Sequence, residues 1–188
     1  RVEIQGMVGP EAPDRRARTG WHVAGGTLTG PGTLRMEALS WQGGAMAGKG
    51  ATWVHEVATF GAERAESRST LSLGRTLVLS HRGPGESRGR WREADLKVRD
   101  SGRLQVGGDE AGDQPFVLEV RGGNPERPLS FTSTDGTGEI ATGSGGALVV
   151  TDEAGLKVSA PLDNDGGVVA ERESLLELDG GGNSSGEF

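Results

Sequence analysis

One short segment of the chain matches a pattern that is used by nucleophilic serines. Gly85 to Gly89 reads Gly-Glu-Ser-Arg-Gly, with Ser87 at its centre. The chemistry requires a strand before the serine and a helix after it, so that a sharp turn exposes the hydroxyl. Pro84 precedes the pattern, and no clear helical period follows it. Because Gly-rich chains produce such matches by chance, we predict that Ser87 is not catalytic.

The histidines offer no local metal site. His22, His55 and His81 are far apart in sequence and lack His-x-His or His-x-x-x-His spacing. The chain has no cysteine, which excludes both disulfides and thiolate ligands. We therefore interpret the three histidines as turn or surface residues, and we predict neither a metal nor another cofactor.

Carboxylates gather in several Gly-containing segments. Polysaccharide-cleaving β-helices use clustered carboxylates, sometimes with Ca²⁺, so these groups are candidates for catalysis. Acidic corners are more often solvated turns, and we predict that the protein is not an enzyme. The candidate residues are Asp109, Glu110, Asp113, Asp152, Glu153, Asp163 and Asp165.

Aromatic residues and one glycosylation pattern are the remaining candidates for binding. The chain has four tryptophans, Trp21, Trp41, Trp53 and Trp91, and exposed tryptophans can stack on sugars. Trp41 and Trp53 fall near expected strand positions, where packing against the core or a neighbouring coil is favoured. Asn183-Ser-Ser matches the acceptor pattern for N-linked glycan and indicates a surface corner.

The charge of the chain argues against nucleic acid as a partner. The net charge is -7, whereas phosphate binding requires a concentrated basic face. The densest basic cluster carries interleaved acidic residues and is typical of a solvated face. It contains Arg82, Arg88, Arg90 and Arg92 together with Glu86, Glu93 and Asp95. The chain contains no run of about 18 apolar residues, so the sequence predicts no membrane span in this segment.

Glycine-rich repeats dominate the organisation of the chain. Of 188 residues, 34 are glycine and only 4% are aromatic, so any core must be narrow. GGTLTGPGTLRM from Gly25 is followed by GGAMAGKGATWV from Gly43, an offset of 18 residues. Glycine allows sharp turns at positive φ, and the residues between turns are too few for a helix. The repeat predicts short strands joined by Gly corners.

A second repeat consists of two apolar pairs joined by a polar link. It occurs at Leu96–Val106, Leu148–Val158 and Val168–Leu178, and the last two copies are offset by 20 residues. Periods of 18 to 20 residues favour an all-β solenoid, in which each coil pairs with the coils above and below. Roughly eight such coils, one strand spacing apart, would form the body.

The period is interrupted between Leu96 and Leu148. Their spacing of 52 residues is no whole number of coils, and the Pro residues within residues 107–135 indicate a loop insertion there. Residues 1–20 also fit the repeat poorly and are expected to form a lead-in or cap. The predicted solenoid therefore covers residues 21–188.

The repeats resemble those of secreted bacterial adhesins and autotransporter-like passenger proteins, which form pectin-lyase-like β-helices. The resemblance lies in GGTLTGPGTLRMEALSWQGGAMAG, TLSLGRTLVLS and PLDNDGGVVAERESLLELDGGGNSSGEF. It implies a right-handed parallel β-helix at the cell surface or outside the cell, with a structural or adhesive role. The sequence departs from that family in having few asparagines.

The function expected from the sequence is therefore an extracellular structural or adhesive repeat protein that forms or decorates a cell-surface or filament assembly. Its expected partners are copies of itself, other surface proteins and glycans. Two alternatives stay open from the residues alone: a polysaccharide-acting β-helix enzyme and a carbohydrate-binding β-sandwich module.

Overall fold

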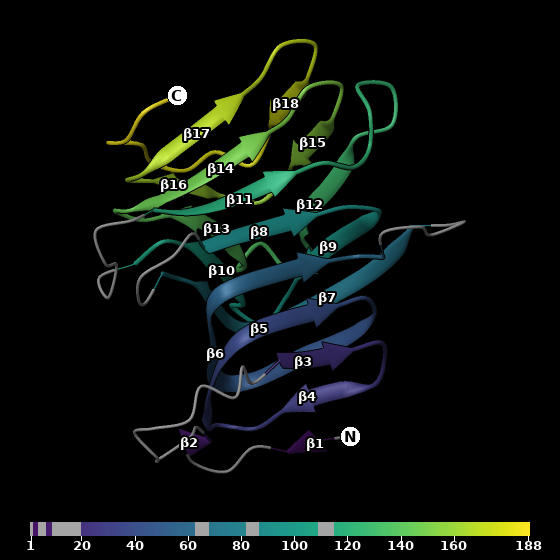
Figure 1. Ribbon diagram of the computed structural model, residues 1–188, viewed down its shortest axis with the longest axis vertical. Coiled ribbons are helices and arrows are strands. Elements are labelled where there is room, and N and C mark those ends of the chain that lie inside the picture. The colour runs from purple at the N-terminus through teal and green to yellow at the C-terminus, as the bar shows by residue number, and fades with distance from the viewer. Residues whose placement is uncertain (1, 4–6, 9–19, 63–67, 82–86, 109–114) are drawn as a thin grey trace.

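A computed structural model describes residues 2–3, 7–8, 20–62, 68–81, 87–108 and 115–188. Within these residues the regular structure consists of β-strands, and all pairings between the named strands are parallel. The strands stack into an elongated body with the two chain ends at opposite ends of the stack (Figure 1). Parallel pairing excludes the β-sandwich alternative, which is built from antiparallel sheets.

The pairing register divides the strands among three faces. Face A contains β2 (Met7–Val8), the beginning of β5 (Thr33–Trp41), the middle of β6 (Gly44–Phe60), the end of β7 (Ser69–Leu79), β10 (Arg103–Val106), β13 (Glu139–Thr142) and β16 (Leu162–Asn164). Face B contains β3 (Gly20–Val23), the ends of β5 and β6, β8 (Ser87–Trp91), β11 (Phe116–Val120), β14 (Gly146–Val150) and β17 (Gly167–Ala170).

Face C contains β1 (Val2–Glu3), β4 (Thr27–Thr29), the beginnings of β6 and β7, β9 (Ala94–Val98), β12 (Leu129–Ser133), β15 (Gly155–Val158) and β18 (Leu175–Leu178). Each turn of the chain visits face C, then A, then B. The described strands give eight passes through face C. The predicted fold, an all-β parallel β-helix of stacked coils, is confirmed.

Both repeat offsets correspond to one coil. Thr27 pairs with Ala45, which confirms the 18-residue offset, and Leu156 pairs with Leu176, which confirms the 20-residue offset. The spacing between Leu96 and Leu148 has a different origin. Leu96 lies on face C, whereas Leu148 lies on face B, so the two motifs turn different corners of the helix. A whole number of coils is therefore not expected between them.

The longest coils lie in the middle of the stack. Leu104 pairs with Ile140, 36 residues later, because the connections between the strands of this coil contain more residues than those of the shorter coils. Residues 107–135 include the strands β11 and β12. Pro125 and Pro128 lie in the connection between these strands, while residues 109–114 lie outside the described part. The expected lead-in, residues 1–20, contains the described fragments β1 and β2. Strand β1 pairs with β4, and β2 pairs with β5.

Alternation places one side of every strand in a narrow core. Strand β8, for example, alternates buried and exposed residues along its five positions. Four aromatic rings form a continuous edge-to-face stack inside the core, with centroids 6.1 to 6.3 Å apart. They are Trp41, Phe60, Trp91 and Phe131. Edge-to-face contact is a favoured geometry for aromatic pairs, so these rings fill the middle of the stack.

In the described part of the chain, no helix has the length and apolar character needed to cross a membrane.

Candidate functional surfaces

Ser87 begins strand β8 on face B, where its side chain is buried. Its hydroxyl donates to the backbone carbonyl of His55 at 2.9 Å, and its Oγ lies 2.6 Å from Nδ1 of His81. Because a hydroxyl has one proton, both contacts can be hydrogen bonds together only when Nδ1 of His81 is the donor. A histidine that activates a serine must instead accept the serine proton. With Nδ1 as the donor the histidine does not accept the serine proton, and Ser87, which is 3% exposed, is a buried hydrogen-bonding residue between coils.

The interpretation of the histidines as turn or surface residues is correct for one of them and wrong for two. His22 is exposed on β3 and lies 3.3 Å from Oγ of Ser40. His55 and His81 are 7% and 3% exposed. Nδ1 of His55 lies 3.0 Å from Oγ of Ser80. Both histidines are buried because they lie where the chain passes from face A to face B and successive coils stack over them.

A polar groove lies on the outside of face A, with a volume of about 490 Å³. Its floor is formed by residues in register on three strands, since Gln105 pairs with Ala141 and Ala141 pairs with Asp163. Arg103 and Glu139 form an ion pair beside it. The remaining residues along the groove are Gly108, Thr142, Gly143, Ser144 and Asp165.

The two carboxylates of this groove fasten the last coil. Oδ1 of Asp163 accepts a hydrogen bond from the backbone N–H of Asn183 at 3.2 Å, and Oδ1 of Asp165 accepts one from Oγ of Ser185 at 2.6 Å. Among the described residues, no three or more His, Asp or Glu side chains gather in a way that could hold a metal ion. The groove therefore offers hydrogen-bonding groups for a ligand.

The other acidic candidates are separate from this groove. Asp152 and Glu153 are exposed in the turn between β14 and β15, as expected of a solvated corner. The candidates Asp109, Glu110 and Asp113 lie outside the described residues.

The tryptophans divide between core and surface. Trp41 is fully buried, as expected from its strand position. Trp91 is also fully buried, and Trp21 packs partly against the core. Trp53 is only partly buried, because it occupies an outward position of β6 between two buried neighbours. The guanidinium of Arg35 lies 4.9 Å from the centre of its ring, a cation–π contact that covers one ring face.

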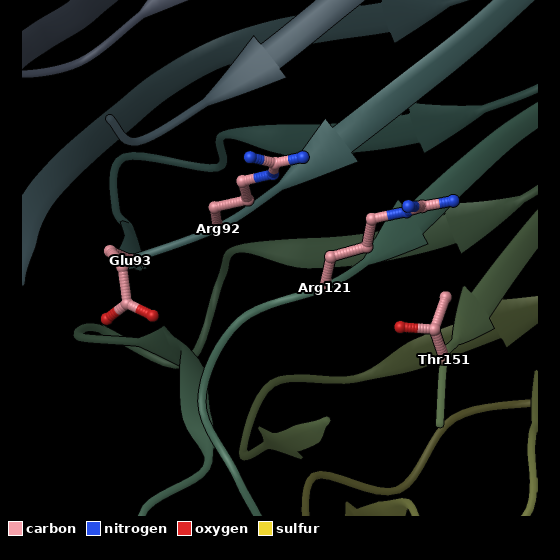
Figure 2. Close-up of a pocket in the computed structure, with 4 residues that line it drawn as sticks. All are labelled: Arg92, Glu93, Arg121 and Thr151. Atoms are coloured by element: carbon pink, nitrogen blue, oxygen red, sulfur yellow. The ribbon is translucent and has the colours of Figure 1, made fainter. Parts of the chain in front are cut away.

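A smaller notch of about 360 Å³ lies at the corner between faces B and C. Arg92, Arg121 and Thr151 follow the ends of β8, β11 and β14, and the two guanidinium groups extend in the same direction (Figure 2). Nε of Arg121 is 2.7 Å from a carboxylate oxygen of Glu119. Glu93 lines the other side, so the notch carries both signs of charge.

The basic cluster of the sequence is split by the fold. Arg88 and Arg90 are exposed on the outside of β8, while Arg92 lines the notch; Arg82 and Glu86 lie outside the described residues. Glu93 and Asp95 form ion pairs with Arg68 at 4.0 and 3.8 Å.

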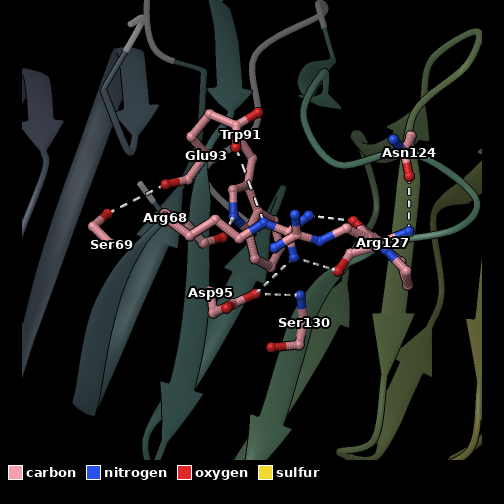
Figure 3. Close-up of polar contacts among 10 residues, drawn as sticks. Arg68, Ser69, Trp91, Glu93, Asp95, Asn124, Arg127 and Ser130 are labelled. Atoms are coloured by element: carbon pink, nitrogen blue, oxygen red, sulfur yellow. Dashed lines mark hydrogen bonds and ion pairs between the residues drawn. The ribbon is translucent and has the colours of Figure 1, made fainter. Parts of the chain in front are cut away.

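Arg68 fastens the corner between β11 and β12 (Figure 3). Its guanidinium donates to the backbone carbonyls of Arg127 and Pro128. Asp95 in turn accepts the backbone N–H of Ser130 at 2.8 Å. This arginine has a structural role that the sequence pattern did not indicate.

The glycosylation candidate, Asn183, is exposed in the last coil. Its backbone pairs with Asn164 and Asp163, which fixes the position of the Asn-Ser-Ser segment at the surface. Asn164 itself points inward, where its side chain bonds Thr142 and donates to the carbonyl of Glu187 at 3.0 Å. Inward polar contacts of this kind are not visible in the sequence, because they depend on which residues adjacent coils superimpose.

The chain was compared with protein-family models, curated proteins and solved structures. None of them matches it. The interpretation of the surfaces therefore depends on the chemistry of the groove, the notch and the stacked coils alone.

Proposed function

We propose that the protein is an extracellular structural or adhesive repeat protein, whose β-helix forms or decorates a cell-surface or filament assembly. The observation that supports this most strongly is the unbroken parallel stack on three faces. A parallel ladder that ends in an exposed strand can continue onto a further strand of the same kind. The candidate nucleophile Ser87 is 3% exposed and hydrogen-bonds the backbone of an adjacent coil, which favours a non-enzymatic role.

The last coil presents a surface suited to such continuation. Leu178 is 41% exposed, whereas Val158, its in-register partner one coil below, is fully buried. Phe188 is also exposed in this coil. The inward-facing apolar residues of β18 would gain burial if another strand stacked on this end of the described coils. Copies of the same chain are the partners proposed for this surface.

The groove on face A supports glycans as a second class of partner. It is open, is lined by Arg103, Gln105 and Asp163, and presents donors and acceptors of the kind that sugar hydroxyls use. Binding of a polysaccharide there would provide the adhesive role. Cleavage would require an acid–base pair of carboxylates, and Asp163 and Asp165 are engaged by the last coil instead.

The assembly proposal is tested by electron microscopy and sedimentation of the wild-type chain and two variants. We expect filaments or ordered layers from the wild type and dispersed particles from Leu178→Asp, because a charge on the end coil opposes stacking. Val57→Asp is the matched control: Val57 is 46% exposed, but it lies on the outside of face B within the stack. Dispersed wild-type particles would contradict the proposal, as would equal loss of assembly in both variants.

A further inference from the structure

Arg75 is a charged residue buried at the corner between faces C and A, and no carboxylate of the described residues forms an ion pair with it. It follows the part of β7 that pairs with β9 and precedes the part that pairs with β10. Its exposed fraction is 2%. Arginine is almost never fully buried unless it is paired, so its surroundings require an explanation.

The hydrogen bonds of Arg75 use only part of its guanidinium. Nη2 donates to the carbonyls of Gly32 at 2.7 Å and Ala51 at 2.8 Å. A guanidinium has five N–H groups, and the three on Nε and Nη1 are buried without a hydrogen-bond partner. None of the ion pairs among the described residues includes Arg75. Burial of a charge in this state is strongly unfavourable.

A cavity of about 490 Å³ adjoins this residue. Besides Arg75 it is lined by Lys49, Thr76, Asp100, Ser101 and three glycines, Gly48, Gly50 and Gly74. A Cβ at Gly50 would lie 2.5 Å from Nη2 of Arg75, so the glycine permits the guanidinium to lie against the chain. Cavities of this size are typical of small-ligand sites.

We propose that this cavity binds an oxyanion, the carboxylate or sulfate group of an acidic sugar or the free ion, which pairs with Arg75 and Lys49. Such a ligand would balance the buried charge and supply acceptors for the unpaired N–H groups. Desolvation lowers the pKa of the Arg75 guanidinium, which reflects the same lack of a compensating charge. The whole chain carries a net charge of -7, so attraction of an anion must come from this local pair of cations.

Asp100 adjusts the affinity of the site. Its carboxylate lies at the exposed rim of the cavity, where it forms a 3.6 Å ion pair with Nε of Arg99. Because its charge has the sign of the ligand, its removal is expected to strengthen binding. This proposal does not depend on assembly of the chain or on the groove of face A.

The test is thermal unfolding of the intact chain in sulfate, in glucuronate and in chloride at matched ionic strength. At about tenfold excess over the dissociation constant, we expect either oxyanion to raise the Tm by about 3–6 °C relative to chloride. Arg75→Met should abolish this rise. Arg90→Met, which removes the same charge from an exposed position of β8, should retain it.

Titration calorimetry of Asp100→Asn gives an independent measurement. We expect this variant to bind sulfate about two- to fivefold more tightly than the wild type. A response to glucuronate identifies an acidic sugar as the ligand class, whereas a response to sulfate alone identifies a free oxyanion.

Equal Tm values for the wild type in all three salts would overturn the proposal. It would also fail if Arg75→Met kept the oxyanion response; if that variant does not fold, the wild-type and Asp100→Asn titrations decide.

Discussion

At the scale of single residues, Asp135 connects two neighbouring turns. Its carboxylate accepts the backbone N–H of Thr137 at 3.0 Å within its own turn. It also accepts the backbone N–H of Asp100 at 2.7 Å from the turn of the coil below. Hydrogen bonds to the ionised form, chiefly that from Thr137, lower the pKa of Asp135 from 3.8 to about 2.

This shift predicts a specific acid dependence. A carboxyl with a lowered folded-state pKa contributes stability above its unfolded pKa and loses it as the pH falls toward the folded value. The stabilisation by Asp135 should therefore be present above about pH 4 and decline toward pH 2. Asp135→Asn should be less stable than the wild type at pH 6, and the difference should shrink below pH 4. Denaturant unfolding across this range measures it.

The control for this acid dependence is Asp152→Asn, in an exposed turn. This variant is expected to follow the wild type at every pH. A difference between wild type and Asp135→Asn that is independent of pH would contradict the assigned role of the carboxylate.

Residue roles were the least predictable feature of the sequence. The spacing of His55, His81 and Ser87 gave no reason to expect that they meet, since their contacts depend on how one coil superimposes on the next. The sequence around Arg75 did not indicate that this residue is buried, for a similar reason. Its buried guanidinium donates to carbonyls that lie 43 and 24 residues away in sequence.

At the scale of the elements, glycines allow neighbouring corners to approach closely. Gly146 begins β14, and a Cβ at this position would lie 2.0 Å from the carbonyl oxygen of Val106. Gly146→Ala must therefore shift the backbone of one coil. We expect a loss of about 1–3 kcal/mol in the free energy of unfolding. Denaturant unfolding monitored by circular dichroism checks this value.

Gly25 provides the comparison for Gly146. A Cβ there would meet nothing within 4 Å, and its φ is not in the left-handed region. Gly25→Ala should change stability by less than about 1 kcal/mol, with either no effect or a slight gain. Similar losses in both variants would show that close approach of the backbone does not explain the glycine at Gly146.

The strands themselves were largely predictable, because alternating apolar residues and Gly corners specify them locally. The 18- and 20-residue offsets each identified true coil neighbours. The face on which each motif lies was not predictable. LKVRDSGRLQV and LVVTDEAGLKV look alike because every corner needs a polar turn between two inward-facing pairs, yet they turn different corners.

At the scale of the whole molecule, the strand pairings join each coil to the coils directly below and above it, while Arg68 and Arg75 add hydrogen bonds to carbonyls two coils away. Stability in such stacks is approximately a sum of coil terms and nearest-neighbour interface terms. Leu156 is fully buried and pairs with Leu129 below and Leu176 above. Leu156→Asp places a charge in the core, at an expected cost of about 4 kcal/mol or more.

The damage from Leu156→Asp should remain near its site. In hydrogen exchange, protection should be lost in β12, β15 and β18 and persist in β5 and β6, which lie several coils away. Val169→Asp, at an exposed outward position of β17, should leave protection unchanged. Wild-type thermal stability of Leu156→Asp, or uniform loss of protection along the chain, would contradict the nearest-neighbour description.

Coil length varies from 18 to 36 residues while the strands of successive coils stay paired, with register shifts at Met36/Ala38 and Ala47/Ala51. The additional residues of the longer coils therefore fall in the connections between paired strands. Doubling the length of a flexible loop costs only about 0.6 kcal/mol in closure entropy. Exposed corners whose backbone makes few hydrogen bonds are consequently suitable positions for grafting a peptide or a small domain with adjacent termini. The same geometry allows evolution to diversify one loop at a time on an unchanged scaffold.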